Sequence, residues 1–446
     1  MKKLLAILLT LALLVTLTGT LSGCEKKQKP LRVLVDLDGL VGAGDGFSPI
    51  SSMTFADTLE QIVIANGGPT DVEYELLPKD GAERKSAMTR LRTEIMAGNG
   101  PDVFIMAFYR DFEDWYEPAA LFLHPEKSRE LGLFYPLDDY IENARFMQWD
   151  KLTPVIMEAG RSEEWGQVIL PLAYTFPITA FNKSEVTHTP SREMTYQDLI
   201  RDETLWGAAV PAGYENLGSE SLGKIADYAS KKLLITEEEL LQRGREQAEL
   251  TIKYYNETEG GWDLSNINHW NTKMAVAFDG IIPYNEAVGG ADQPATLVPV
   301  YSDDGGITAT VTAWAAINAT CKRPDDAFFI LDLLLSRNVQ QDSLLYQFLT
   351  VGVGVPVYEG LMNYNTPVRS STGAGGIGTW AMKPEDYETF CQLRDCITAV
   401  RIYSSMEMLV GDTFTDFINM YNRNEPDTTA EDAAKLYMRL KQELSE

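Results

Sequence analysis

The sequence predicts an α/β fold, and three features of its first hundred residues support this class. Short apolar runs at 31–36, 72–77 and 102–107 have the length and composition of buried strands. The two segments between them carry apolar residues at helical spacing, and each closes on glycine and proline. The order strand, helix, strand, helix, strand is typical of a parallel sheet with crossover helices.

The elements follow in this order. The first strand is Leu31–Asp36, and a glycine-rich loop at 38–46 comes after it. A helix is expected at Ser52–Ala65 because Asn66-Gly-Gly-Pro69 is a stop signal. The run 72–77 alternates like a strand.

The second helix and third strand complete the pattern. Residues 83–96 place Met88, Leu91 and Ile95 on one helical face, and Asn99-Gly-Pro101 ends that helix. The strand at 102–107 follows. Ligands of such sheets bind beyond the carboxyl ends of the strands, so we expect the loops after Asp36 and after Met106 to reach a site.

The N-terminus has the features of a secretory signal. Lys2 and Lys3 precede an apolar stretch that runs to about Leu17, and this stretch is short for a membrane span. Leu21-Ser-Gly-Cys24 resembles the lipobox of bacterial lipoproteins, in which the cysteine is lipidated and becomes the first residue. We therefore expect a signal peptide at 1–23, lipidation of Cys24 and a polar tether at 24–30.

Composition excludes some classes of function. A formal net charge of −27 repels phosphate backbones, which argues against binding to nucleic acid. With 45% hydrophobic and 10% aromatic residues, the chain has ample material for a core. A length of 446 residues favours two lobes over one.

The sequence gives little support for a metal site, a disulfide or a bound cofactor. Cys321, Cys391 and Cys396 have neither redox nor zinc spacing, so we expect buried or half-buried thiols. The histidines, His124, His188 and His269, are far apart in the sequence. Asp36, Asp38 and Asp45 hint at calcium, but Phe47 stands where an EF-hand needs glutamate. No metal and no cofactor is expected.

Catalytic motifs are absent from the sequence, which has no GxSxG, HExxH or P-loop. Gly373–Gly378 fits GxGxxG by letter. Because we expect no strand before it and no helix after it, a mobile loop is the better interpretation than a dinucleotide site.

Several segments resemble, in order, the bacterial extracellular solute-binding proteins of ABC importers, and the sugar-binding members in particular. Leu91–Ile105 resembles the family's helix that ends in glycine, proline and aspartate before a strand. The other matching segments are Tyr135–Ile141, Ile169–Lys183, Met194–Leu199, Lys273–Gly280, Ala313–Asp332 and Val410–Leu444. The departures are Tyr196, where tryptophan is common, and the glycine-rich loop after the first strand.

The resemblance implies a periplasmic-binding-protein-like fold. Two α/β lobes are joined by hinge crossovers near Tyr174–Ala180, Val276–Gly280 and Thr308–Ala316, with the ligand cleft between them. Lobe one would hold residues 31–176 and 280–312. Lobe two would hold residues 177–279 and 313–446.

A cleft that combines aromatic rings with carboxylates suits a sugar, because rings pack on the C–H face and carboxylates bind the hydroxyl rim. Residues of these types occur just past a strand end, at the expected crossovers and in a loop that could cover the cleft. The expected ligand-binding residues are Phe108, Tyr109, Asp111, Tyr174, Asp279, Tyr284, Trp314 and Trp380.

The resemblance further implies a monomeric binder, not an enzyme, that captures an extracellular solute by hinge closure and delivers it to the transmembrane subunits of an ABC permease. The expected solute is a mono- or oligosaccharide; a polyol, sugar phosphate, uronide or peptide is the alternative. Lipid on Cys24 would attach the protein to the outer face of the cell membrane. A secreted carbohydrate-active enzyme and a non-transport surface-binding protein are the competing functions.

Overall fold

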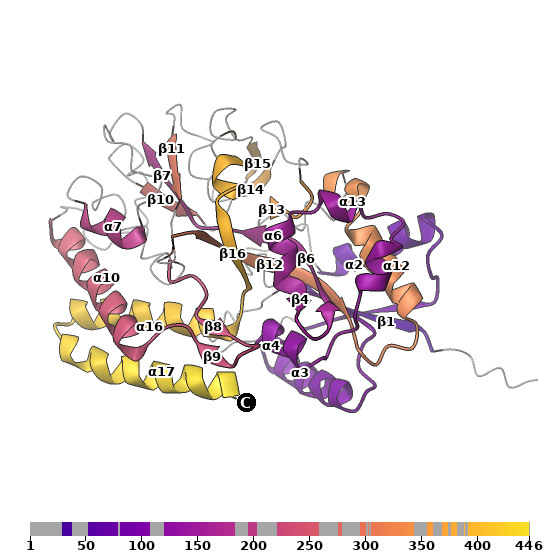
Figure 1. Cartoon of the computed structure of the whole chain (residues 1–446), viewed down its shortest axis with the longest axis horizontal. Coiled ribbons are helices and arrows are strands. Elements are labelled where there is room, and N and C mark those ends of the chain that lie inside the picture. The colour runs from indigo at the N-terminus through magenta and orange to yellow at the C-terminus, as the bar shows by residue number, and fades with distance from the viewer. Residues whose placement is uncertain are drawn as a thin grey trace, which may run out of the picture.

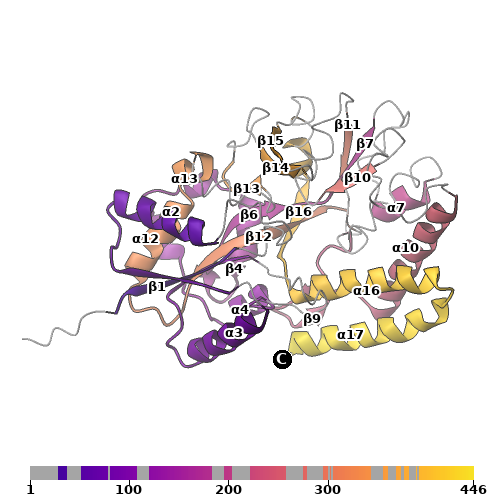
Figure 2. The same ribbon diagram turned by 180° about the vertical axis from the view of Figure 1, so that it is seen from behind.

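The computed structural model describes residues 29–37, 52–78, 81–107, 120–182, 195–202, 221–257, 275–278, 295–299, 302, 305–342, 355–359, 368–372, 376–380, 388 and 391–445. Figure 1 shows two halves. One contains β1, α2, α3 and α12, the other contains α7, α10, α16 and α17, and strands β6 and β12 run between them. Figure 2 shows the same arrangement from behind.

The first five expected elements are confirmed. They are β1 (Leu31–Asp36), α2 (Ser52–Ala65), β2 (Val72–Leu76), α3 (Gly81–Met96) and β3 (Val103–Ala107). β1 pairs in parallel with both β2 and β3. The crossover helices therefore join neighbouring parallel strands, as the order of elements predicts.

The main sheet is mixed rather than parallel. It has seven strands in the order β13-β6-β12-β3-β1-β2, and β16 also pairs with β12. The added strands are β6 (Ile169–Thr175), β12 (Ile307–Ile317), β13 (Val355–Pro356) and β16 (Ile397–Ile402). β12 is antiparallel to β3 and β6 but parallel to β16.

Strand β12 changes neighbours along its length. Its first part, Ile307–Val311, pairs with β16, and its last part, Ala313–Ile317, pairs with β3. The register against β6 shifts around Ala313. Such an irregularity bends a strand, which lets β12 serve both halves of the molecule.

Short helices and hairpins surround the sheet half. The helices are α4 (Pro125–Glu130), α5 (Asp138–Glu142), α6 (Pro154–Met157), α12 (Pro324–Leu334) and α13 (Arg337–Asp342), with 3₁₀ turns η2 (Trp149–Lys151) and η3 (Glu158–Gly160). Strands β4 (Arg161–Ser162) and β5 (Gly166–Gln167) form a hairpin.

The other half is built mainly from helices. Its long members are α10 (Glu237–Glu257), α16 (Ser405–Asn422) and α17 (Thr429–Ser445), with η6 (Pro426–Thr428) joining the last two. The shorter α7 (Tyr196–Arg201) begins with a capping box between Thr195 and Asp198. Strands β7 (Ile178–Asn182), β10 (Ala275–Phe278) and β11 (Ala295–Pro299) form a small sheet, and β8 (Ala226–Asp227) pairs with β9 (Lys232–Leu233).

The segment after β12 packs with the first sheet, unlike the expected division, which gave 313–446 to lobe two. Residues of α12 share one hydrophobic cluster with β1 and β3. The Asp332 carboxylate accepts hydrogen bonds from the backbone N–H groups of 145–147. Arg323 pairs with Asp71, 2.7 Å away. Because β12 pairs with β3 and β6, it carries the chain back to the main sheet, and residues 313–342 pack there.

Two further expectations concern glycines and thiols. Gly376 and Gly378 of the GxGxxG match lie in β15 (Gly376–Trp380), which pairs antiparallel with β14 (Val368–Thr372). The mobile-loop interpretation is therefore wrong at these two residues. The expectation that no strand precedes the match is also wrong, because β14 does. A β-hairpin still lacks the helix that a dinucleotide site needs. Cys321 is buried and Cys391 and Cys396 are half-buried, as expected.

Candidate functional site

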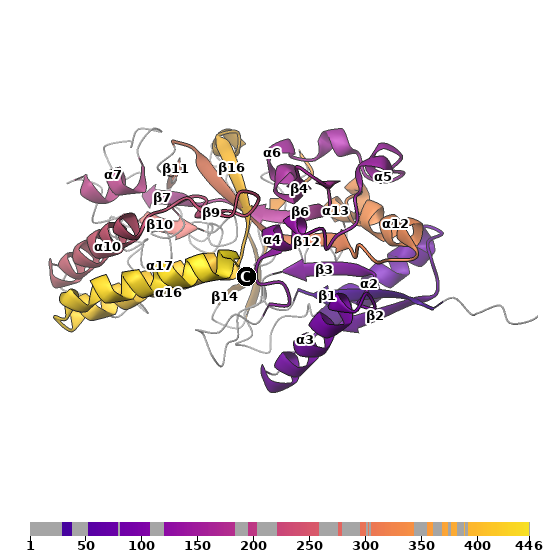
Figure 3. The same cartoon turned by 60° about the horizontal axis from the view of Figure 1, so that its bottom comes forward.

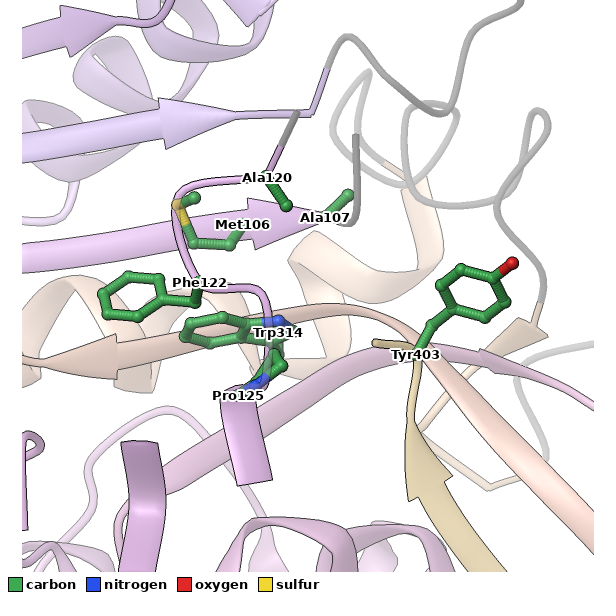
Figure 4. Close-up of a pocket in the computed structure, with 7 residues that line it drawn as sticks. All are labelled: Met106, Ala107, Ala120, Phe122, Pro125, Trp314 and Tyr403. Atoms are coloured by element: carbon green, nitrogen blue, oxygen red, sulfur yellow. The ribbon is translucent and has the colours of Figure 1, made fainter. Parts of the chain in front are cut away.

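A small apolar pocket lies at the carboxyl end of β3 (Figure 4), where the sheet rule places ligands. Its volume is about 10 Å³, which holds roughly one water molecule. This pocket is therefore too small to enclose a solute, and we call it the floor of the candidate site. The pocket is lined by Met106, Ala107, Ala120, Phe122, Pro125, Trp314 and Tyr403.

An aromatic cluster fixes this floor. The Phe122 ring meets the rings of Phe104, Phe134 and Trp314 edge to face, with centroids 5.1, 5.4 and 5.6 Å apart. This geometry is the preferred one for aromatic pairs. Only 3% of Trp314 is exposed. The rings thus form a rigid platform on which the pocket rests.

A buried ion pair stands beside the pocket, because Asp36 of β1 is in register with Met106 of β3. The Arg84 guanidinium donates to both carboxylate oxygens of Asp36, over 2.5 and 3.1 Å. Both side chains are 1% exposed. The charge of Asp36 is therefore already paired, so this carboxylate is not placed to serve as the acid or base of a glycosidase.

Tyr403 forms the opposite edge of the pocket. It directly follows β16, and its backbone N–H donates to the carbonyl oxygen of Val311 in β12. In Figure 4 its ring points away from the aromatic cluster. Tyr403 is half-buried and is the aromatic side chain at this edge of the pocket.

The structure brings one of the expected site residues, Trp314, to the pocket. Tyr174 is 1% exposed within β6 and stacks on Phe176, with ring centroids 6.5 Å apart. Burial raises the pKa of Tyr174. Trp380 ends β15, and nothing is described of its side chain. The remaining candidates lie outside the described residues: Phe108, Tyr109, Asp111, Asp279 and Tyr284. Their ligand role stays a prediction.

Among the pocket residues that sequence reasoning missed are Tyr403, Phe122 and Pro125. Tyr403 is an aromatic residue just past a strand, so the rule that selected Phe108 would have found it once β16 was recognised. Pro125 is the first residue of α4, and Phe122 comes three residues before it. No local pattern assigns those two to the pocket, because the packing of Phe122 on Trp314 is a tertiary contact.

A larger groove of about 370 Å³ lies elsewhere, between α4, η3, β4 and β16. Its main charged groups pair with neighbours in the protein: Arg129 with Glu130 at 2.7 Å, and Lys224 with Glu126 at 3.5 Å. Glu130 also accepts a hydrogen bond from Ser162. A groove in which several charges are already paired offers less to a solute than its volume suggests.

None of the helices in the described residues is both long and apolar enough to cross a membrane. In the same part of the chain, no group of three histidine, cysteine or carboxylate residues is arranged to hold a metal ion.

No protein-family model matches the sequence, and no curated protein matches it. The fold, by contrast, is found in solved structures. An extracellular solute-binding protein family 1 from Alicyclobacillus acidocaldarius matches with a TM-score of 0.53 at 13% identity, over 94% of this chain and all of that one.

Two other solved structures are similar over 93% of this chain and 98% of theirs. A periplasmic oligogalacturonide binding protein from Yersinia enterocolitica has a TM-score of 0.53 at 16% identity. An ABC substrate-binding protein from Listeria monocytogenes, in complex with cycloalternan, has a TM-score of 0.52 at 12% identity. Two de novo designed esterases also match, with TM-scores of 0.54 and 0.56. At such identities a likeness establishes fold alone, and this chain has the α/β fold of periplasmic and extracellular solute-binding proteins.

Proposed function

We propose that the protein is the solute-binding component of an ABC importer and that its solute is a mono- or oligosaccharide. The observation that carries this proposal is the similarity of fold over nearly the whole chain to solute-binding proteins, two of which bind oligogalacturonide or cycloalternan. The pocket at the end of β3 supports it, since it presents an aromatic residue at its edge.

Solute would bind between the two lobes, and contacts from both would favour the closed arrangement. Phe108, Tyr109 and Asp111 come within four positions after β3 in the sequence. With Asp279, Tyr284, Trp314 and Trp380 they are the proposed ligand residues, whereas Tyr174 is covered by the core. The closed, monomeric protein would then dock on the transmembrane permease without any covalent chemistry.

We also propose that residues 1–23 are removed and that lipid on Cys24 holds the protein on the outer face of the membrane. The signal features of the sequence support this. Intact-mass measurement on membrane-extracted protein tests it. A chain that begins at Met1 with an unmodified Cys24 would contradict it.

A thermal-shift screen of the purified chain against sugars, polyols and peptides tests the solute class. Binding of a sugar raises the melting temperature by mass action. If a peptide shifts the transition and no sugar does, the sugar proposal fails. Release of reducing ends from candidate glycans would favour the enzyme alternative instead.

Tyr403→Ala tests the pocket itself once a binding sugar is known. Loss of an aromatic contact worth about 1.4 kcal/mol weakens binding about tenfold. Tyr437→Ala is the matched control, because Tyr437 lies on α17 beside Lys441, away from the pocket. Equal affinity of the wild type and Tyr403→Ala by calorimetry would place the sugar elsewhere.

A further inference from the structure

A polar junction joins the two halves below the pocket. The C-terminal end of α17 and the first turn of α16 lie next to α4 in all three views (Figures 1, 2 and 3). The backbone N–H of Ser405, at the start of α16, donates to the carbonyl oxygen of Leu123 over 3.0 Å. The junction therefore ties the chain just before α4 to the helical half.

Side chains strengthen this tie. Glu443 of α17 lies 3.2 Å from Nε2 of His124 and accepts a hydrogen bond of 2.8 Å from the Ser405 hydroxyl. Lys127 of α4 donates to the backbone carbonyl of Glu443 over 2.8 Å. A cation at a helix C-terminus bonds the last carbonyls and is favoured by the helix dipole. The tie thus combines a carboxylate contact with a helix cap.

The other ring nitrogen of His124 is also engaged. Its Nδ1 lies 3.3 Å from the Tyr228 hydroxyl, and the two rings are 5.9 Å apart. The side chains of His124 and Glu443 are 11% and 18% exposed. Partial burial strengthens hydrogen bonds to charged groups, since water competes with them less.

Serine, histidine and glutamate together suggest a hydrolase, but the geometry does not support one. The Ser405 hydroxyl donates directly to the Glu443 carboxylate over 2.8 Å, and it lies farther, 3.3 and 3.5 Å, from Nε2 and Nδ1 of His124. In a catalytic triad, the serine hydroxyl bonds to the histidine, and the carboxylate bonds to the other ring nitrogen and not to the serine. Ser405 is 1% exposed and lines neither of the two cavities described above.

The junction is continuous with the pocket. Phe122 and Pro125 line the pocket and flank His124 in sequence, and Tyr403 lies two residues before Ser405. A hydrogen bond between Leu123 and Ser405 therefore sets how far the Phe122 edge of the pocket stands from the Tyr403 edge. Any rotation of the helical half against α4 must stretch or break it.

We propose that Glu443, with His124, Ser405 and Lys127, is an interlobe latch that positions the two edges of the pocket and stabilises the lobe arrangement described here. These are positioning residues that act through Phe122 and Tyr403. The consequence for solute affinity rests on the proposed function, but the latch itself does not. To move the lobes, a ligand must bind the new arrangement more tightly than the present one. The difference in binding free energy must exceed the free energy that the latch contacts supply.

Hydrogen exchange on the solute-free chain tests the latch, with Glu443→Ala as the variant. Peptides that cover 121–127 and 403–409 should exchange about tenfold faster, the change expected when hydrogen bonds to a charged group are lost. Peptides from β1 and β3 should keep the exchange of the wild type. Glu443→Gln, which keeps the shape and can still bond Ser405, should give an intermediate rate.

Glu431→Ala is the matched control, since Glu431 lies on the same helix, is 74% exposed and pairs only with Lys435 at 2.9 Å in the described contacts. Unchanged exchange in Glu443→Ala, or an equal increase in β1 and β3, would overturn the latch. Because no solute is present, that result leaves the solute-binding proposal standing. A failed sugar screen likewise leaves the exchange result intact.

Discussion

The sheet half and the helical half are stabilised in different ways. One continuous hydrophobic cluster joins β1, β3, β6, β12 and α12, and a buried ion pair completes it. Among its described residues, the helical half has two smaller clusters, which involve α10, α16 and α17. Its stability therefore depends more on local features such as caps and close helix contacts.

The ion pair of the sheet half gives the largest expected effect. Arg84→Ala leaves the Asp36 carboxylate buried without its partner, and we expect a loss of about 3–5 kcal/mol in the free energy of unfolding. Urea unfolding measures it. Arg90→Ala on the same helix is the control: Arg90 is 49% exposed, so its pairs contribute about 0–1 kcal/mol. Similar losses in both variants would contradict this view of the sheet half.

The second-largest loss of stability is expected where two helices of the helical half pack closely. A Cβ atom added at Gly244 of α10 would lie 2.5 Å from Cδ2 of Phe417 in α16. Gly244→Ala should cost about 1–3 kcal/mol through overpacking, although alanine favours helices. The exposed Gln242→Ala should stay within about 0.5 kcal/mol in the same urea experiment. A stabilised Gly244→Ala would show that the helices can move apart freely.

The N-cap of α16, Ser404, contributes to the stability of the helical half. Ser404 accepts a hydrogen bond from the backbone N–H of Met406, and Glu407 accepts one from the backbone N–H of Ser404. Ser404→Ala should lower stability by about 1 kcal/mol. Thr413→Ala removes a hydroxyl that bonds within the same helix and should change stability by less than about 0.5 kcal/mol. Equal effects would mean that the cap is not what stabilises this helix.

The smallest expected effect depends on pH. Burial raises the pKa of Glu443, but hydrogen bonds from His124 and Ser405 outweigh it, and the net shift is downward from 4.5. A carboxyl whose folded-state pKa is lowered stabilises the fold above its unfolded pKa, and this is lost as pH falls through the folded value. The wild type should therefore exceed Glu443→Gln in stability at pH 6, and the difference should shrink below about pH 4.5. A difference that stays constant to pH 3 would contradict it.

Local pattern predicted the first five elements because each depends on its own sequence. Alternation marks β2, and helical spacing with a glycine stop marks α2, so both could be assigned without tertiary contacts. The lobe to which 313–342 belongs depends on the pairing of β12 with β3. That pairing joins residues more than 200 positions apart, which no local pattern records.

The same limit applies to the candidate site. Trp314 was selected because it stands at an expected crossover, and it does line the pocket. Tyr174 was selected by the same rule, yet its ring is covered by the core. The position of a residue along a strand predicts how far it lies from the end of the sheet. It does not predict which side chains cover that residue, because these come from distant segments, as Phe122 does for Trp314.

Strand β12 has a consequence for dividing the protein into fragments. Its 11 residues reach about 36 Å, far enough to pair with β3 at one end and β16 at the other. A cut anywhere within Ile307–Ile317 would leave one fragment without a strand for β3 and the other without a partner for β16. Pieces meant to reassemble as a split reporter must therefore keep this strand whole, and the fragment without it will expose a bare sheet edge.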